Sequence, residues 1–326
     1  MGPGTGAGGH RRGTLAGVSD AATGTSDRPV NGAPPDRPAA ALPPVVAAEE
    51  VARWLAGGRD DVVVADVRWY LDGRSGRDAY RAGHVPGAVW VDVDAVLAAP
   101  PSAPAGRHPL PSPDAFASAL GALGIGDDDL VVAYDDQGGG MAARLVWMLR
   151  RTGQGAALLD GGLGAWPGPL ATGDEVRPPV RRRVRPWPAA LVRDADQVAA
   201  AAAPGAVVLD ARVPGRYAGT EGLPSERRWG HVPGARSAPW PANLGDDGRF
   251  RSPDELRAHY AALGADGTAD VVVYCGSGVT ACHDLLALER AGLPPASLYP
   301  GSWSAWSEDD ARPVATGPEP GGDPSP

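Results

Sequence analysis

A cysteine at the end of an apolar, β-branched run is the residue of this sequence best suited to nucleophilic chemistry. Residues 271–274 read Val-Val-Val-Tyr, Cys275 follows them, and a loop of small residues leads into an apolar, helix-like segment. This pattern predicts a buried strand, then Cys275, then a helix. Because Gly276 and Gly278 lack a Cβ atom, the loop can turn backbone N–H groups inward. These donors and the positive end of the helix favour a thiolate nucleophile.

The alternative is that Cys275 is an apolar filler, as many free cysteines are. Its place at a strand end, between a strand and two glycines, favours the nucleophile. We expect the second cysteine, Cys282, on the following helix. Two cysteines seven residues apart are poorly placed for a disulfide and supply too few ligands for a metal site. This cysteine usage is typical of a reducing compartment, and we expect a cytoplasmic protein.

The sequence contains an internal repeat, and its length indicates a domain duplication. Tyr134 and Trp166 recur as Tyr274 and Trp306, in each case 140 residues later. Each copy has an apolar run with an Asp and an Arg at its end, a Gly-His-Val-Pro-Gly-Ala turn, a second apolar run and an aromatic segment. The matching segments are residues 62–68 and 207–212, 83–88 and 230–235, 131–135 and 271–275, and 159–166 and 299–306.

In both copies apolar runs alternate with helix-like segments, which is typical of parallel sheets with helices on both faces. The helix-like segments are residues 115–123, 141–150, 254–263 and 284–291. We expect an N-terminal domain over 41–170, a linker over 171–188 and a C-terminal domain over 189–316. The extension 1–40 is poor in large apolar residues and is expected to be disordered, and the tail 317–326 to be loose.

The charge of the chain argues against several classes of partner. A net charge of −9 disfavours binding to nucleic acid or to an anionic membrane. No apolar run is long enough to cross a bilayer. The sequence contains no lysine, so an anion site has to use arginine, histidine or backbone N–H groups.

The loop Cys-Gly-Ser-Gly-Val-Thr-Ala that starts at Cys275, together with the repeat, resembles the rhodanese-type sulfurtransferases, in particular the 3-mercaptopyruvate sulfurtransferases. The resemblance implies an α/β fold of two tandem rhodanese-like domains, each a mostly parallel sheet flanked by helices on both faces. It implies transfer of sulfur from 3-mercaptopyruvate to a thiol or cyanide through a persulfide on Cys275, without a metal or organic cofactor. The implied partners are a small-molecule sulfur donor and an acceptor that is a small thiol or a thioredoxin-like protein.

The two copies differ at the position of the nucleophile. The N-terminal copy has Asp135 where the C-terminal copy has Cys275, so the resemblance implies that the N-terminal domain is catalytically silent. That domain would still supply Asp94 and His108, which match the family's aspartate and histidine and would form a Ser–His–Asp relay with Ser277. From the residues alone, His108 could instead cap a loop and Asp94 could be a surface carboxylate.

The charged end of the donor is expected to meet arginine. Arg216 matches the arginine with which the family binds its donor, and a second arginine usually follows before the Gly-His turn. Arg227 and Arg228 both qualify for that second role. Backbone groups of the active loop are expected to complete the site, and they belong to Gly276, Gly278, Val279 and Thr280.

Other repeated polar residues are interpreted as structural, because one copy of each lies in the silent domain. His84 and His231 both stand in a turn-forming Gly-His-Val-Pro-Gly-Ala segment. Asp66 and Asp210 each end a strand-like run just before an arginine, which predicts a structural Asp–Arg contact.

Three alternatives stand beside the leading hypothesis. A thiosulfate sulfurtransferase would use the same nucleophile, but relatives that favour thiosulfate typically carry basic residues after the cysteine, where this chain has Gly276 and Ser277. A cysteine phosphatase needs Cys-x5-Arg, and the corresponding position is Ala281. A sulfur-carrier or binding module without turnover is the third alternative, and the intact cysteine loop argues against a purely structural role.

Overall fold

The computed structural model describes residues 1–2, 4, 6, 9, 42–202 and 206–321. The chain divides into two units, residues 1–37 and 38–326, and every helix and strand given below belongs to the second unit. The extension predicted to be disordered therefore lies, apart from residues 1, 2, 4, 6 and 9, outside the described residues. Among the described helices, none has the length and apolar character needed to cross a membrane.

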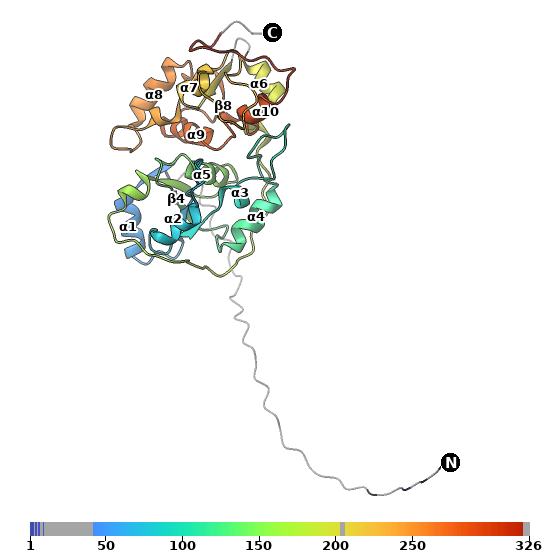
Figure 1. Ribbon diagram of the computed structural model, residues 1–326. Coiled ribbons are helices and arrows are strands. Elements are labelled where there is room, and N and C mark those ends of the chain that lie inside the picture. Colours follow the sequence, from blue (N-terminus) through green and yellow to red (C-terminus); the bar gives the residue numbers. More distant parts are fainter. Residues whose placement is uncertain (3, 5, 7–8, 10–41, 203–205, 322–326) are drawn as a thin grey trace. The chain divides into compact units, whose positions relative to one another are not determined.

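The N-terminal half forms a parallel five-stranded sheet with the order β1-β5-β4-β2-β3 (Figure 1). Its central strands are short runs of β-branched and apolar residues that are buried on both faces, which favours parallel pairing. The strands are β1 (Val45–Ala47), β2 (Val62–Asp66), β3 (Val89–Trp90), β4 (Leu130–Tyr134) and β5 (Ala156–Asp160).

Helices connect these strands and cover the sheet. Their bounds are α1 (Ala48–Ala56), α2 (Gly76–Ala82), α3 (Val93–Val96), α4 (Pro113–Ala122), α5 (Ala142–Arg151) and the short 3₁₀ turn η2 (Gly162–Ala165). α4 begins two residues before the predicted start, because the Ser112 hydroxyl accepts the N–H of Ala115 at 3.1 Å and Pro113 fits the first helical position.

The C-terminal half repeats the arrangement with the strand order β7-β6-β8-β9. A single parallel bridge between Val192 and Leu298 takes the place that β1 has in the first sheet. The strands are β6 (Ala206–Asp210), β7 (Arg236–Ser237), β8 (Asp270–Tyr274) and β9 (Ser297–Leu298). The helices are η3 (Ala189–Leu191), α6 (Ala195–Ala201), α7 (Pro214–Ala218), η4 (Trp240–Asn243), α8 (Pro253–Ala262), α9 (Ala281–Arg290) and α10 (Ser302–Trp306). Parallel sheets flanked by helices confirm the predicted fold class.

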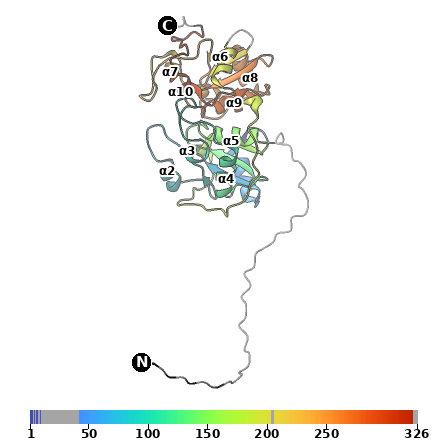
Figure 2. The ribbon, with the colours of Figure 1, turned by 90° about the vertical axis from the view of Figure 1, so that its right-hand side faces the viewer.

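Alternation along the strands divides the core into layers. Val63 and Ala65 of β2 enter a core that both halves share, whereas Val62 and Val64 enter a separate core of the N-terminal half. The shared core includes α5 and α9, which lie next to each other in both views (Figures 1 and 2). One half therefore supplies a buried wall for the other, next to the loop that follows β8.

The repeated polar residues are structural, as predicted. Arg68 binds Asp66 in a fork at 2.7 Å and donates to the Gly83 carbonyl at 2.7 Å, which ties a strand end to the His84 turn. The C-terminal copy repeats these bonds with Arg212, Asp210 and Gly230. His84 and His231 are buried and stack on Tyr80 and Tyr217, respectively.

Residues 317–320 of the predicted loose tail form backbone hydrogen bonds with the C-terminal half. The Gly317 N–H donates to the Ala218 carbonyl at 2.9 Å, and the Pro320 carbonyl accepts the N–H of Gly234 at 2.6 Å. These bonds hold the segment against the C-terminal half because the backbone groups of the tail find partners beside α7 and the His231 turn. Residues 322–326 lie outside the described residues.

Candidate active site

The nucleophile candidate lies where β8 ends and before α9 begins. Cys275 is 1% exposed, and its Sγ accepts the N–H of Gly278 at 3.1 Å. The N–H of Trp303 donates to the Cys275 carbonyl at 2.9 Å, so α10 fixes the backbone at the strand end. Gly278 has φ +80°, and a Cβ there would lie 2.6 Å from the Pro300 carbonyl oxygen, so only glycine fits this turn.

The N-terminal copy of this loop has a carboxylate, Asp135, at the position of Cys275. The Asp135 carboxylate is fully buried and accepts four backbone N–H groups at 2.8–3.0 Å. The donors are Gln137, Gly139, Met141 and Ala142. Burial raises the pKa of Asp135, and these four bonds oppose the rise. The N-terminal loop is thus an anion cradle, whereas the backbone donor to Cys275 Sγ in the C-terminal loop is the N–H of Gly278.

The predicted relay residues meet across the two halves. The Ser277 hydroxyl lies 2.7 Å from Nδ1 of His108, and Nε2 of His108 lies 3.0 Å from Oδ1 of Asp94. Because a carboxylate only accepts, Nε2 carries the proton, and Nδ1 is left to accept from Ser277. Trp69 donates to Oδ2 of Asp94 at 2.9 Å and packs edge-on to the imidazole. The contacts match the predicted arrangement, and their catalytic role stays a prediction.

The pKa of His108 is lowered from its ordinary value, mainly by burial, against the opposing effect of Asp94. The neutral imidazole therefore persists below about pH 6.5, the ordinary histidine value. We expect His108 to remain available as a base down to that pH, so kcat/KM should stay constant there. It should fall only as the pH passes through the lowered pKa of His108. A pH–rate profile of the wild type and of His108→Gln checks this: the variant should lose the acid limb and about 10²–10⁴-fold in rate. An acid limb above pH 7 that survives in His108→Gln would contradict the assignment.

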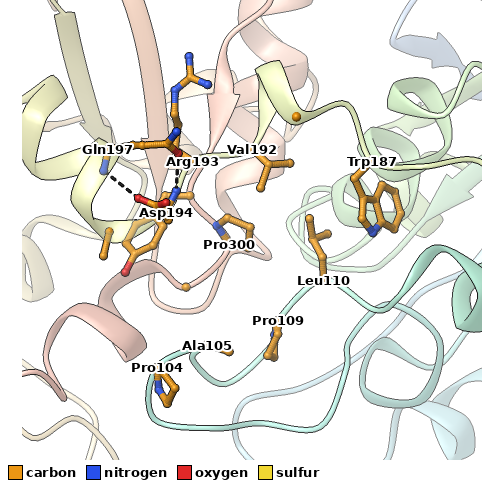
Figure 3. Close-up of a pocket in the computed structure, with 14 residues that line it drawn as sticks. Pro104, Ala105, Pro109, Leu110, Trp187, Val192, Arg193, Asp194, Gln197 and Pro300 are labelled. Carbon is orange, nitrogen blue, oxygen red and sulfur yellow. Dashed lines mark hydrogen bonds between the residues drawn. The ribbon is translucent and has the colours of Figure 1, made fainter.

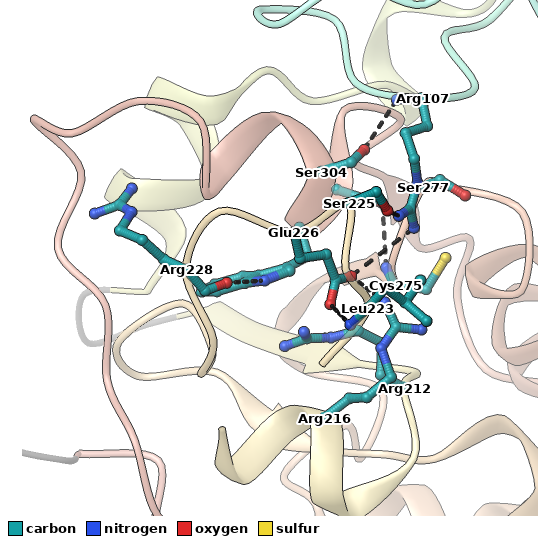
Figure 4. Close-up of polar contacts among 12 residues, drawn as sticks. Arg107, Arg212, Arg216, Leu223, Ser225, Glu226, Arg228, Cys275, Ser277 and Ser304 are labelled. Carbon is teal, nitrogen blue, oxygen red and sulfur yellow. Dashed lines mark hydrogen bonds and ion pairs between the residues drawn. The ribbon is translucent and has the colours of Figure 1, made fainter. Parts of the chain in front are cut away.

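A cluster of two arginines and one glutamate lies next to the residue after the nucleophile (Figure 4). A Cβ on Gly276 would lie 2.8 Å from Nη2 of Arg216 and 3.2 Å from Nη2 of Arg107. The Glu226 side chain, 1% exposed, forms an ion pair with Arg216, and its Oε1 lies 3.8 Å from Nη2 of Arg107. Arg107 is also held by the Ser225 hydroxyl at 2.8 Å. Both Arg107 and Glu226 are absent from the predicted site.

Arg227 and Arg228, predicted as donor-binding, are placed elsewhere. Arg227 is exposed and pairs with Asp310 at 2.7 Å. The guanidinium of Arg228 donates to the backbone carbonyls of Ser307 at 3.0 Å and of Arg312 at 2.7 Å, among others, and points away from Cys275 in Figure 4. The structure therefore does not bring either of them to Cys275, because their guanidiniums are held by the chain after α10.

A further arginine that sequence reasoning missed connects the halves at the site. Arg144 of α5 is fully buried and donates to the carbonyls of Gly278 at 2.7 Å, His108 at 2.9 Å and Leu97 at 3.1 Å. It thus fixes both the cysteine loop and the segment that carries the relay histidine. Burial lowers the pKa of Arg144, but a guanidinium stays charged in proteins.

Cys282 lies in the first turn of α9, which confirms its place on a helix. Its Sγ contacts the Gly278 carbonyl at 3.5 Å, and burial raises its pKa to about 12. Cys282 is therefore a neutral thiol at neutral pH. Among the described residues, no three His, Cys, Asp or Glu side chains are grouped so that they could hold a metal ion.

Two pockets flank the site. One of about 470 Å³ is lined by Asp94, Arg107, His108 and the alanines and prolines at 95 and 98–101. The other, of about 620 Å³, is lined by Leu110, Trp187, Pro300 and neighbouring residues, most of them apolar (Figure 3). Only the first pocket is lined by relay residues, so it is the better candidate for an approach to the chemistry.

Comparison with known proteins agrees with this geometry. Residues 47–168 and 194–309 each match the rhodanese-like domain family. A probable 3-mercaptopyruvate sulfurtransferase from Pseudomonas aeruginosa is 43% identical over 79% of this chain and 93% of the relative. A putative thiosulfate sulfurtransferase, SseB, from Mycobacterium tuberculosis is 39% identical over 84% of this chain and 97% of the relative. The crystal structure of SseA from Escherichia coli, described as a 3-mercaptopyruvate enzyme, matches with a TM-score of 0.70 and 32% identity and covers 81% of this chain and 100% of that chain.

The chain therefore belongs to the rhodanese-like domain family. Within it, the two matched domains and the named relatives make this chain a tandem-domain sulfurtransferase.

Proposed function

We propose that the protein transfers sulfur from 3-mercaptopyruvate to a thiol acceptor through a persulfide on Cys275. The observation that carries the proposal is the convergence on one cysteine loop of a relay and an arginine cluster from both halves. Ser277, 2.7 Å from His108, stands two residues after the nucleophile. Curated relatives over most of the chain carry the name 3-mercaptopyruvate sulfurtransferase.

In the first step the Cys275 thiolate attacks the thiol sulfur of the donor. An S–S bond forms on Cys275, the donor's C–S bond breaks, and its electron pair leaves with the carbon as the enolate of pyruvate. The thiol proton passes to that carbon, and Ser277 with His108 moves it, Asp94 holding the imidazole in the required tautomer. No external oxidant is needed, because the C–S electron pair ends in the new C–H bond.

In the second step an acceptor thiolate attacks the outer sulfur and releases the Cys275 thiolate. The persulfide needs donors for its negative charge, and the Asp135 loop indicates where they are. Its N–H donors at 137, 139, 141 and 142 correspond by the 140-residue repeat to Ser277, Val279, Ala281 and Cys282. A persulfide places its outer sulfur about one bond beyond Sγ, as a carboxylate places its oxygens beyond Cγ. The two loops differ at one of these positions, since Gly139 has φ +89° and Val279 has no positive φ. Support for a persulfide cradle in the active copy therefore comes from the shared register and from the N–H of Gly278, 3.1 Å from Sγ.

The donor is assigned from the charge of the site. A carboxylate can accept from Arg216, whose buried Nε has no hydrogen-bond partner among the described residues. The two positions after Cys275 carry no charge, whereas a compact dianion such as thiosulfate favours cations there. The acceptor is proposed to be a small thiol or a thioredoxin-like protein, and the location cytoplasmic, since both cysteines are free thiols.

Steady-state kinetics with one common thiol acceptor test the donor assignment. We expect kcat/KM for 3-mercaptopyruvate to exceed that for thiosulfate by about tenfold or more, because each missing charge-assisted hydrogen bond costs about 1.5–3 kcal/mol. Arg216→Ala should lower kcat/KM for 3-mercaptopyruvate by a similar factor. A wild-type preference for thiosulfate would overturn the donor and leave a thiosulfate sulfurtransferase, the function named for the Mycobacterium tuberculosis relative.

A further inference from the structure

Glu226 is the one carboxylate whose oxygens contact the arginine pair beside Gly276 among the described residues. Its Oε1 pairs with Arg216 and lies 3.8 Å from Nη2 of Arg107, while its Oε2 accepts the N–H of Leu223 at 3.0 Å. The Glu226 side chain is 1% exposed, against 18% and 27% for Arg216 and Arg107. A carboxylate this buried is kept only where its charge is compensated.

The cluster therefore has a defined net charge. The two guanidiniums carry two positive charges, and Glu226 removes one of them. Arg212 lies nearby as well, but its charge is balanced by an ion pair with Asp210, in which Nη2 lies 2.6 Å from Oδ2. The site that faces a donor next to Gly276 is thus monocationic.

We propose that Glu226 sets the charge selectivity of the donor site: it holds Arg107 and Arg216 in place and cancels one of their charges, so that the site matches a monoanionic carboxylate better than a dianion. The inference rests on the proposed function for the place of the donor. It adds Glu226 to the site and says that the net charge of the arginine cluster determines which donor is preferred. Glu226 is a positioning residue, since it acts through the two arginines and not on the reacting sulfur.

Arg107 has a distinct place in this rule. It comes from the silent half, and its own N–H donates to the Ser304 hydroxyl at 3.0 Å. Its pKa is lowered, first by burial and against the opposing effect of Glu226. The silent half therefore supplies one of the two charges that Glu226 balances.

Charge variants test the rule through the ratio of kcat/KM for thiosulfate to kcat/KM for 3-mercaptopyruvate. Glu226→Gln raises the net charge of the cluster by one, and we expect the ratio to rise by about ten- to a hundredfold. The reason is that the electrostatic attraction to one extra positive charge is twice as large for a dianion as for a monoanion. Arg107→Gln lowers the charge by one and should lower the ratio. The double variant restores the net charge, and its ratio should return to within about threefold of the wild type.

Controls separate charge from structure. Glu226→Asp keeps the charge and should keep the ratio, and Asp310→Asn removes a carboxylate from the exposed pair with Arg227 and should leave the ratio unchanged. Competitive inhibition by sulfate, a dianion, and by pyruvate, a monoanion, gives an independent readout. The ratio of the inhibition constant of pyruvate to that of sulfate should be about tenfold higher in Glu226→Gln than in the wild type. If Glu226→Gln does not fold, Arg107→Gln and Glu226→Asp still test the rule.

The inference fails if Glu226→Gln and Arg107→Gln move the ratio in the same direction, or if neither moves it by more than about threefold. That outcome differs from failure of the proposed donor. A wild type that prefers thiosulfate contradicts the donor assignment, whereas the shifts among the variants test Glu226 whichever donor the wild type prefers.

Discussion

Replacement of Cys275 by serine is expected to abolish sulfur transfer, with a loss of at least about 10⁴-fold in kcat/KM. A serine hydroxyl at this position can neither be deprotonated at neutral pH nor form a persulfide, so the covalent route is lost and not merely slowed. Steady-state assays with 3-mercaptopyruvate and a thiol acceptor measure the loss, and circular dichroism checks that the variant folds.

Cys282→Ser is the matched control for this experiment. Cys282 has the same buried neighbourhood and contacts the Gly278 carbonyl, but its pKa of about 12 keeps it neutral. We expect its variant to retain activity within a few-fold of the wild type. Comparable losses in the two variants would show that the cysteines act through packing, and would contradict a nucleophile at Cys275.

Removal of the Arg144 side chain is expected to lower both the stability of the fold and its activity. Arg144→Met leaves the carbonyls of Gly278, His108 and Leu97 without their donor, at a cost of about 3 kcal/mol or more in the free energy of unfolding. Both the cysteine loop and the relay lose their common anchor. Because misplacement by about 1 Å costs about 10²-fold, we expect kcat/KM to fall by that factor or more.

Arg150 on the same helix offers a matched control. It is nearly buried and joins the halves through Glu289, but it contacts no part of the cysteine loop. Arg150→Met should lower the thermal midpoint and spare kcat/KM. Arg144→Lys, which keeps the charge but cannot span three carbonyls, should show an intermediate loss and provides a reading if the methionine variant does not fold. Equal kinetic losses in Arg144→Lys and Arg150→Met would remove the special role of Arg144.

The sequence was sufficient for the parts of this molecule that depend on local pattern. Apolar runs and their spacing predicted both sheets, and the flanking glycines predicted the loop at Cys275. The Asp–Arg contacts at Asp66 and Asp210 followed from the repeat. In each case the determining residues lie within a few positions of one another, so that periodicity and backbone freedom carry the information.

Residues that act across the two halves were harder to predict. His108 and Asp94 entered only through resemblance, because nothing local brings residues of one half to Ser277 in the other. Arg144 lies in a helix whose apolar residues dominate its pattern, and its carbonyl partners are set by how α5 packs beside the cysteine loop. The sequence feature that could have indicated Arg144 is a charged side chain within an otherwise apolar helix.

The arginine cluster illustrates the same limit. Arg227 and Arg228 were preferred because they stand in the expected segment, but side-chain direction in a short loop is set by tertiary partners, here the carbonyls after α10. The neighbouring Glu226 turns toward the site instead, and Arg107 adds a guanidinium from the other half. A buried glutamate between arginines has no signature in sequence spacing.

Mass spectrometry of the enzyme after brief exposure to 3-mercaptopyruvate without acceptor tests the central claim most directly. We expect one added sulfur atom on Cys275 and none on Cys282, together with release of about one equivalent of pyruvate. The added mass should disappear when a thiol acceptor is supplied. A donor that is turned over with no sulfur ever appearing on Cys275, or with sulfur appearing on Cys282 instead, would contradict it.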